Sequence, residues 1–552
     1  MLVAAALPEV DTPTLRKARG AFFTPEPISR FVTAWAVREA TDAVLEPSAG
    51  DASFLVQAAQ RLRDLAGSEH RPQVTGVEIH PHSARVARDR VEAAGGDPTV
   101  IESDFFLVRP RPVYDVVVGN PPYIRYQDFT GEGRSRSRAA ALQAGVSLTA
   151  LASSWAAFTI HSALFLRQGG RMGLVLPAEL LSVNYAGAVR RFLFERFRSV
   201  ELVLFSQQVF PDAEADVLLL LADGFDEGPT DHAVIYQATD AEALQTMDRP
   251  STWTPSDPAG KWTSLLVDPA AALPLRSLRG RGLFTDLEAW GDTTLGMVTG
   301  NNKYFALSPA RVRELGLRRS DLLRLSPPGS AHLRGLELSS ADLVRLGRQG
   351  RSTWLFRPTG RPSAAALAYI EAGHLAGVDQ AYKCRVRTPW YQVPMLAPAD
   401  LLLTCMNADT PRLTTNTARA HHLNSVHGVY LHKHVADLGR ELLPLASMNS
   451  VTLLHAEIVG RSYGGGILKL EPREADGWAM PAPDLIRRRA SRLRAVRDEV
   501  VGLLSVGALM PAVETVDRAL FGRLLTTGDL QVVRRAHEAM THRRFTRGNS
   551  GR

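Results

Sequence analysis

The chain has 552 residues, of which 45% are hydrophobic and 22% are charged, a composition that excludes collagen-like and wholly disordered proteins. Because a single hydrophobic core stops growing at roughly 250–300 residues, this length predicts at least two domains. The formal net charge of +7 suits a polyanionic partner without demanding one, and Cys384 and Cys405 lack the spacing of a zinc site or a disulfide framework.

The first part of the chain predicts a mostly parallel α/β sheet. Seven short apolar runs alternate with longer segments of helical pattern between about residues 40 and 223. The runs are AVLEP (43–47), VTGVEI (74–79), PTVIES (98–103), YDVVVGN (114–120), RMGLVLP (171–177), VELVLF (200–205) and ADVLLLLAD (215–223). Such alternation indicates parallel strands with helices on both faces, and the last two runs predict an antiparallel hairpin at one edge.

The pattern changes after the last of these runs. The sequence from 224 to about 290 is polar and irregular. A second domain follows, without a regular alternation of strands and helices, and the pattern after PAPD (481–484) is that of a helix. We therefore predict a domain at 1–235, a connecting region at 236–290, a second domain at 291–480 and a helical C-terminal segment at 481–552. A short apolar start without a basic lead and the lack of any run of ~18 apolar residues predict a soluble, cytoplasmic protein without membrane contact.

Three acidic residues lie at the ends of successive predicted strands. LEPSAGDASFL (45–55) reads as a strand, a tight turn with Gly50 and a helix start, but it lacks the G-x-G-x-x-G that cradles a pyrophosphate. Glu78 closes the second run, where a carboxylate can accept from ribose hydroxyls. Asp104 follows the third run, where it can accept from an exocyclic amine while Phe105 covers a ring face. Together these strand ends predict a site for an adenosine-like ligand.

The fourth run ends in Asn120-Pro121-Pro122-Tyr123, at the same edge of the sheet. Because proline has no backbone N–H and a fixed φ, the Asn120 side-chain oxygen and the Pro121 carbonyl are expected to form two acceptors without a competing donor. Such a pair suits an NH2 group, and Tyr123 offers a flat face to the ring that carries it. The alternative for this stretch is a plain Pro-Pro turn that ends a strand.

These segments resemble a known family, the S-adenosylmethionine-dependent DNA methyltransferases that modify the exocyclic N6 amine of adenine, in the gamma arrangement and of the type II restriction-modification kind. ARGAFFTPEPISRFV (18–32) is similar to the family's N-terminal cofactor segment, LEPSAG to its glycine turn and GNPPY to its catalytic motif. The resemblance implies a class I methyltransferase fold, Rossmann-like, with a seven-stranded sheet, followed by a C-terminal α+β target-recognition domain.

The resemblance also implies site residues. The implied cofactor site for S-adenosyl-L-methionine consists of Thr24, Glu46, Pro47, Ala49, Gly50, Glu78, Ile79, Asp104, Phe105, Asn120 and Phe158. The implied catalytic residues are Asn120, Pro121, Pro122 and Tyr123, with Phe210 on the other side of a target base that is flipped out of duplex DNA. No metal ion is expected.

The predicted second domain contains sequence segments similar to those of the family's target-recognition regions, at 296–307, 382–394 and 460–474. In these we expect Lys303, Arg387, Arg461 and Lys469 to contact phosphates and the glycines at 464–466 to let a strand of DNA approach. The segment 127–150 is expected to be a mobile loop that orders on DNA or a flexible surface insertion. The arginines between 487 and 497 are interpreted as a solvated helix face in preference to a phosphate patch.

Two other functions stay open: a methyltransferase of protein glutamine or RNA, and a noncatalytic DNA-recognition subunit. No lysine follows an acidic residue by two positions, so the D/E-x-K of the common nuclease core is missing. Cleavage, if it accompanies this protein, is therefore expected from a separate cognate restriction endonuclease or defence partner. A monomer is expected.

Overall fold

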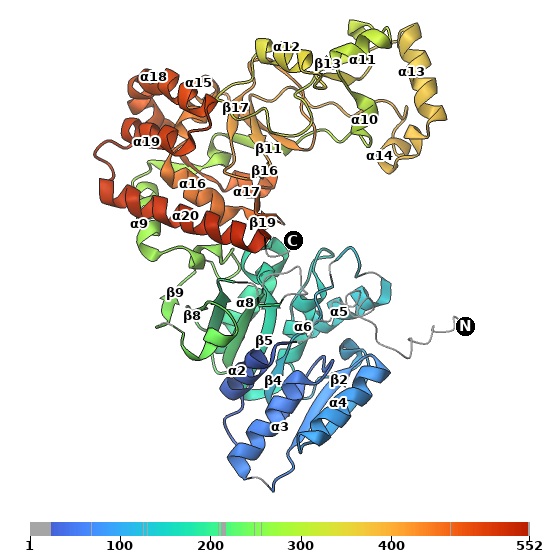
Figure 1. The fold of residues 1–552 in the computed structure, drawn as a ribbon, viewed down its shortest axis with the longest axis vertical. Helices are drawn as coiled ribbons and strands as arrows, with labels where there is room; N and C mark the ends of the chain where they lie inside the picture. Colours follow the sequence, from blue (N-terminus) through green and yellow to red (C-terminus); the bar gives the residue numbers. More distant parts are fainter. Residues whose placement is uncertain are drawn as a thin grey trace. The chain divides into compact units, whose positions relative to one another are not determined.

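The computed structural model describes residues 24–549, apart from 68, 125, 130, 208, 211–216, 248, 256 and 464. The chain forms two compact units: the first extends to Leu265, and the second covers Leu266–Gly548. In Figure 1 the first unit runs from blue to green and the second from green through yellow to red. The predicted segment 18–32 lies outside the described residues as far as residue 23, and Gly464 lies outside them as well.

The first unit is built on one large mixed sheet. Its strands are β1 (Val44–Glu46), β2 (Gln73–Glu78), β3 (Asp97–Glu102), β4 (Tyr114–Gly119), β5 (Leu166–Pro177), β6 (Phe197–Phe205), β7 (Val217–Phe225), β8 (Ala233–Ala238) and β9 (Ser251–Trp253). They lie in the order β3-β2-β1-β4-β5-β7-β6-β8-β9. Each of the seven predicted runs contains a strand within its described residues, and β1 to β5 are parallel, as predicted.

Two details of the predicted sheet are wrong. Within the described residues the sheet has nine strands, two more than the predicted seven. The hairpin of β6 and β7 is antiparallel as expected, but it does not form the edge, because β8 pairs in parallel with β6 and β9 pairs with β8. These two strands come from the polar stretch that was expected to connect the domains.

Helices cover both faces of this sheet. They are α2 (Glu26–Ala36), α3 (Ser53–Ala66), α4 (Pro81–Ala93), α5 (Gly131–Gln143), α6 (Ser154–Ala163), α7 (Glu179–Ser182) and α8 (Gly187–Arg196). Val116 and Val118 of β4 share a core with α2, α3 and α4. The intervening Val117 is equally buried, and because successive strand residues point to opposite faces it packs under the second helix layer. Burial on both faces explains why these strands read as continuous apolar runs.

The described residues of the second unit form four small sheets. Its strands are β10 (Phe284–Asp286), β11 (Gly291–Leu295), β12 (Ala306–Leu307), β13 (Leu322–Arg324), β14 (Trp354–Phe356), β15 (Leu401–Thr404), β16 (Met406–Asn407), β17 (Leu413–Thr415), β18 (Val426–Leu431), β19 (Arg461–Tyr463), β20 (Ile467–Lys469) and β21 (Ala479–Pro481). They pair as β10-β21, β11-β18-β15-β17, β12-β14-β13 and β16-β20-β19. All these pairs are antiparallel.

Helices make up most of the rest of the second unit. They are α9 (Pro269–Gly280), α10 (Asn302–Phe305), α11 (Pro309–Glu314), α12 (Ser340–Arg348), α13 (Ala364–Leu375), α14 (Tyr382–Arg385), α15 (Ala436–Ala446), α16 (Ser450–Val459), α17 (Pro472–Asp476), α18 (Pro483–Ser505), α19 (Leu509–Leu520) and α20 (Thr527–Asn549). Buried residues of α15, α16, α18, α19 and α20 share one core with Trp290 and Trp478. As far as residue 549, the predicted segment 481–552 consists mainly of the helices α18, α19 and α20, which pack into this core. The predicted region 236–290 is divided between the two units.

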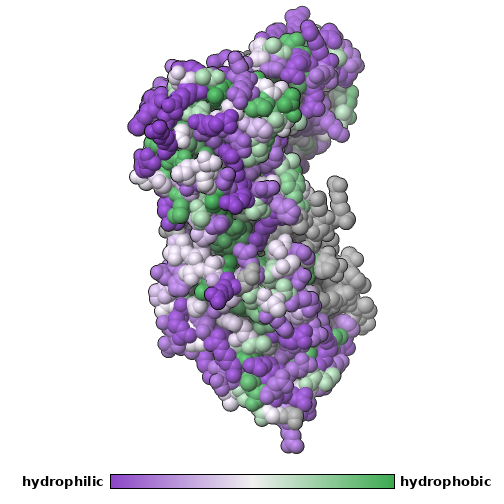
Figure 2. Space-filling view, turned by 60° about the vertical axis from the view of Figure 1, so that its left-hand side comes forward, coloured by the Kyte–Doolittle hydropathy of each residue, from purple (hydrophilic) through white to green (hydrophobic). Residues whose placement is uncertain are grey.

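Among the described helices none alone is long and apolar enough to cross a bilayer, and only the bent pair α15 and α16, at 91° to each other, has that length and composition in combination. The described residues also contain no group of three or more His, Cys, Asp or Glu side chains placed to hold a metal ion. On the face drawn in Figure 2, hydrophilic side chains predominate and hydrophobic ones are scattered among them, because most large apolar side chains are used in the cores.

Candidate active site

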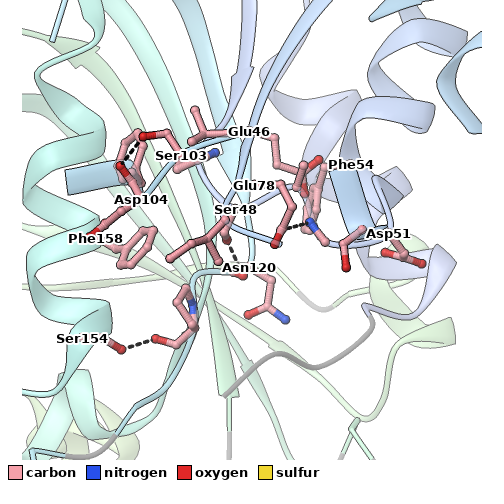
Figure 3. A pocket seen from close by; sticks show the side chains of 18 of the residues that line it. Glu46, Ser48, Asp51, Phe54, Glu78, Ser103, Asp104, Asn120, Ser154 and Phe158 are labelled. Carbon is pink, nitrogen blue, oxygen red and sulfur yellow. Dashed lines mark hydrogen bonds between the residues drawn. The ribbon is translucent and has the colours of Figure 1, made fainter. Parts of the chain in front are cut away.

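The carboxyl ends of the first four strands meet at one cavity of about 420 Å³. Glu46 and Glu78 are the last residues of β1 and β2, Asp104 follows β3, and Asn120 follows β4. Figure 3 shows these four side chains around the same space. All eleven residues implied for the cofactor line it: Thr24, Glu46, Pro47, Ala49, Gly50, Glu78, Ile79, Asp104, Phe105, Asn120 and Phe158. This volume is in the range of sites for small ligands and cofactors.

The turn after β1 and the end of β2 are joined by a hydrogen bond. Gly50 has a φ of +52°, a left-handed conformation in which a side chain would be strained, and its N–H donates to Glu78 Oε2 at 2.9 Å. Glu78 Oε1 accepts from the His80 N–H at 2.8 Å. Two backbone donors therefore fix the Glu78 carboxylate, and each oxygen keeps a second lone pair that can accept from a ligand hydroxyl.

Glu46 is an acidic residue in the wall of the cavity. Its side chain is buried, and Oε2 accepts from the Leu55 N–H at 3.1 Å. Burial, together with the nearby negative charge of Asp51, raises the pKa of Glu46 well above its ordinary value. Because a neighbouring positive charge would favour the ionised form, this end of the cavity is suited to a cationic ligand group.

An aromatic wall closes the end of the cavity near Asp104. The rings of Phe105 and Phe158 are stacked, with centroids 5.3 Å apart, and Phe106 meets Phe158 edge-on at 4.7 Å. Asp104 Oδ1 accepts from the Phe106 N–H at 3.0 Å. Phe105 is almost fully buried, whereas Phe106 is half-buried and also lines the cavity. Sequence reasoning missed Phe106, although its place next to the predicted Phe105 was the available signal.

The segment Asn120–Pro122 is held at its first and last carbonyls. Ser48 Oγ donates to the Asn120 carbonyl at 3.2 Å, and Ser154 Oγ donates to the Pro122 carbonyl (Figure 3). Within the described part of the chain, the Pro121 carbonyl between them accepts no hydrogen bond. Sequence reasoning missed Ser48 and Ser154. Ser48 lies in the glycine turn LEPSAG, which was the available signal. Ser154 lies 32 residues from Pro122, and nothing in the sequence connects the two.

The expectation that no donor competes for the Asn120 side-chain oxygen is wrong. The Tyr123 hydroxyl lies 2.7 Å from Asn120 Oδ1 and 3.1 Å from the Val175 carbonyl. Burial raises the pKa of Tyr123, so this hydroxyl keeps its proton at neutral pH and donates it to one of the two acceptors. Asn120 Nδ2 in turn donates to Thr24 Oγ1 at 3.2 Å, which orients the amide.

Three implied catalytic residues do not line the cavity. Of the residues the structure describes, Pro122 contributes to the wall, whereas Pro121, Tyr123 and Phe210 do not. Phe210 is buried in the core of α2–α4, against which Tyr123 also packs. Residues 211–216, which follow Phe210, lie outside the described part of the chain. The role of Phe210 at a target base therefore stays a prediction.

The four cations implied for DNA differ in their surroundings. Lys303 is exposed. Arg387 donates to the carbonyls of Thr299, at 2.8 Å, and Val298. Arg461 pairs with Glu474, and Lys469 Nζ lies 2.6 Å from Glu471 Oε1. Three of the four thus have partners inside the second unit, and only the partners of Arg387 lie far away in the sequence.

Other expectations for the second unit change as well. The ideal position of a Cβ on Gly466 would lie 2.7 Å from the Phe545 ring, so packing against α20 explains this glycine without a DNA strand. Along α18, Arg487 and Arg494 pair with Asp484 and Glu441, as a solvated face would. In the first unit, the expected loop 127–150 contains α5, because arginine and the run of alanines from residue 139 favour a helix.

The fold and the cavity define a class of protein: a class I S-adenosylmethionine-dependent methyltransferase, with a second unit attached. Residues 11–249 match the model of the family described as N-6 DNA Methylase. Residues 259–521 match the model of the type II methyltransferase M.Eco57I, C-terminal domain. The first unit is therefore similar to the N-6 DNA methylases, and the chain as a whole is related to the type II methyltransferases.

Individual relatives extend over both units. Type II methyltransferase M.XamI of Xanthomonas campestris pv. amaranthicola is 27% identical over 483 residues, which cover 84% of this chain and 85% of that protein. M.AccI of Acinetobacter calcoaceticus is 22% identical over 510 residues, 88% and 89% of the two chains. Among solved structures, the type IIL restriction-modification enzyme MmeI, in complex with DNA, shares the fold with a TM-score of 0.56 and 11% identity, over 94% of this chain and 75% of that one.

These matches establish a DNA methyltransferase of the restriction-modification type, and they favour DNA over the glutamine and RNA substrates that the sequence left open. S-adenosylmethionine is the cofactor of this family. The cavity fits it chemically, because carboxylates line the ends of β1 and β2 and an aromatic wall closes the end near Asp104. When bound there, S-adenosylmethionine supplies an electrophilic methyl group.

Proposed function

We propose that the protein is a site-specific methyltransferase that transfers a methyl group from S-adenosylmethionine to the N6 amine of an adenine in duplex DNA. The observation that carries this proposal is the pair of acceptors at the end of β4. Asn120 Oδ1 belongs to a side chain that lines the cavity, and the carbonyl of the next residue, Pro121, accepts no hydrogen bond from the described residues. An NH2 group has two hydrogens and can donate one to each acceptor.

The two acceptors also provide a chemical advantage. An amine on an aromatic ring is a poor nucleophile because its lone pair is delocalised into the ring. Hydrogen bonds from both of its hydrogens to Asn120 and Pro121 would favour a pyramidal nitrogen with a localised lone pair, directed towards the cavity. Tyr123 would stack on the base and hold its plane. No strong general base is required first, since the nitrogen loses a proton readily once it is alkylated.

The remaining residues have roles in binding. Thr24 and Glu46 would hold the methionine part of the cofactor, Glu78 its ribose hydroxyls, and Asp104 the exocyclic amine of its adenine, with Phe105 and Phe158 forming the apolar wall. The target amine cannot reach this cavity from inside a duplex, so the base has to be flipped out. The second unit would hold the duplex, and the related fold of MmeI, solved in complex with DNA, supports this role.

A labelling experiment tests the proposal. Purified full-length protein is incubated with methyl-labelled S-adenosylmethionine and duplexes of varied sequence, and the digested nucleosides are separated. We expect label in N6-methyladenine and a loss of at least about 100-fold in the Asn120→Ala variant, the size reported when one oriented polar group of an active site is removed. Label in N4-methylcytosine alone, or no label with any duplex, would contradict the proposal.

A further inference from the structure

The helix α5 forms part of the cavity wall. Gly133 of this helix and Phe129 just before it line the cavity, beside Asp104 and Phe106. The helix packs against α6 and against the short turn Phe105–Leu107 that follows Asp104. This segment therefore lies at the end of the cavity that we assign to the adenine of the cofactor.

Three arginines of α5 make different contacts. Arg134 Nε donates to the Phe129 carbonyl at 2.6 Å, and Arg138 Nε donates to the Leu148 carbonyl at 3.2 Å, so both join the helix to its own flanking segments. Arg136 reaches across to the sheet, where Nη1 lies 3.4 Å from Asp104 Oδ2. Its other terminal nitrogen, Nη2, lies 2.6 Å from Glu132 Oε2, one turn earlier on α5.

The geometry at Asp104 leaves an acceptor for a ligand. Oδ1 is used by the Phe106 N–H, whereas Oδ2 faces Arg136 at a distance longer than the 2.7–2.9 Å typical of a charge-assisted hydrogen bond. A carboxylate oxygen has two lone pairs, so Oδ2 can accept from a second donor beside the guanidinium. Because Glu132 fixes the other end of the guanidinium, Arg136 limits the positions that Oδ2 can take.

We propose that Arg136 is a positioning residue for the aminopurine part of the cofactor. It acts through Asp104, by holding Oδ2 where the exocyclic amine can donate to it, and it couples the position of α5 to occupation of the cavity. This inference rests on the proposed function, since it needs an amine-bearing purine at this end of the site. It assigns a selective role to a segment that sequence reasoning expected to be either a mobile loop that orders on DNA or a flexible surface insertion.

A binding experiment with two ligands tests the role of Arg136. S-adenosylhomocysteine carries the amine, and S-inosylhomocysteine carries a carbonyl oxygen in its place. We expect Arg136→Gln to weaken binding of the first by about fivefold, as for one partly exposed ion pair, and to change binding of the second by less than about twofold. The preference of the protein for the amine would therefore fall. Arg136→Lys, which keeps a cation, should restore part of that preference.

Matched variants separate positioning from packing. Arg138→Gln removes a cation of the same helix outside the cavity and should leave both dissociation constants unchanged. In Asp104→Asn, the further change Arg136→Gln should have no effect on the preference, because the two residues act as a unit. In the unaltered protein, S-adenosylhomocysteine should slow hydrogen exchange of the α5 amides, and Arg136→Gln should reduce this protection.

The results that would contradict the role of Arg136 differ from those that would contradict the proposed function. Equal losses for the two ligands, or an unchanged preference, would overturn the role of Arg136 while the proposed function stands, provided that the unaltered protein binds S-adenosylhomocysteine and methylates DNA. If Arg136→Gln does not fold, the test passes to Arg136→Lys, whose preference has to fall below that of the unaltered protein. Failure of the unaltered protein to bind S-adenosylhomocysteine would overturn both proposals.

Discussion

The Tyr123 hydroxyl lies 2.7 Å from the side-chain oxygen of Asn120, the atom that we propose as an acceptor of a hydrogen bond from the target amine. The hydroxyl of Tyr123 and the proposed acceptor of Asn120 are thus in contact. An incoming amine has to share this oxygen with the hydroxyl or displace it towards the Val175 carbonyl, 3.1 Å away. The ring and the hydroxyl of Tyr123 consequently have separable effects.

Substitution of Tyr123 tests this separation. Tyr123→Phe keeps the ring, so we expect kcat/KM for DNA within about threefold of the unaltered value and an unfolding free energy lower by about 1 kcal/mol, the usual contribution of one hydrogen bond. Tyr123→Ala also removes stacking worth about 1–3 kcal/mol and should lower kcat/KM by roughly 5- to 150-fold. Steady-state kinetics and denaturant titration measure both quantities. Equal defects in the two variants would indicate that the hydroxyl takes part in the reaction.

The raised pKa of Glu46 predicts a pH dependence of cofactor binding. Below this pKa the side chain is neutral, and a cationic ligand gains from its ionisation, so a proton is released on binding. The affinity for S-adenosylmethionine should therefore rise with pH, by at most about tenfold per pH unit, until the raised pKa is passed. Calorimetry in buffers of different ionisation enthalpy measures the released proton. Glu46→Gln should bind more weakly at high pH and release no such proton.

Glu46 also predicts a pH dependence of stability without ligand. Since its folded-state pKa lies above its ordinary value of 4.5, the folded state binds more protons than the unfolded state in the interval between the two. Its contribution to stability is fully present below the ordinary pKa and is lost as pH rises through the folded value. The free energy of unfolding, measured by denaturation at several pH values in this interval, should depend less on pH for Glu46→Gln than for the unaltered protein. Identical curves would show that Glu46 ionises normally.

Ser154 is expected to affect catalysis without contacting the base. Its hydroxyl donates to the Pro122 carbonyl and accepts from the Ile124 N–H at 2.9 Å, so it holds the segment after Pro121. Ser154→Ala should lower the single-turnover methylation rate by roughly 5- to 10-fold, the equivalent of about 1 kcal/mol. Ser162→Ala is the matched control, because this buried hydroxyl of the same helix has no hydrogen-bond partner among the described residues. Similar rates for the two variants would contradict the prediction.

Substitution of Lys303 should change the salt dependence of DNA binding, whereas substitution of Arg387 should change the stability of the fold. Lys303 is exposed, and if it meets a phosphate, Lys303→Ala reduces the slope of log affinity against log salt by about 0.9 without changing the melting temperature. Arg387→Ala leaves two carbonyls without their donor and should lower the free energy of unfolding by about 1–3 kcal/mol. Filter binding at several salt concentrations and thermal unfolding distinguish them. An unchanged slope of log affinity against log salt in Lys303→Ala would show that Lys303 does not contact a phosphate.

The sequence by itself determined seven strands of the sheet in the first unit and the polar residues at their ends that surround the cavity. Strands buried on both faces leave continuous apolar runs, and parallel strands bring their carboxyl ends to one edge, so Glu46, Glu78, Asp104 and Asn120 could be placed together from their positions after these runs. The short strand β9 leaves no such run, and it was missed together with β8 in a polar stretch.

Only the tertiary structure decided which polar groups are already paired. Arg387 donates to backbone 88 residues away, and Asn120 and Ser154 find partners 96 and 32 residues away, so no local pattern encodes these contacts. The same holds for Arg136, whose contact with Asp104 depends on the packing of α5 against the turn Phe105–Leu107. Periodicity and chain direction fix where a strand ends, whereas the partner of a side chain depends on distances that arise only when the chain has folded.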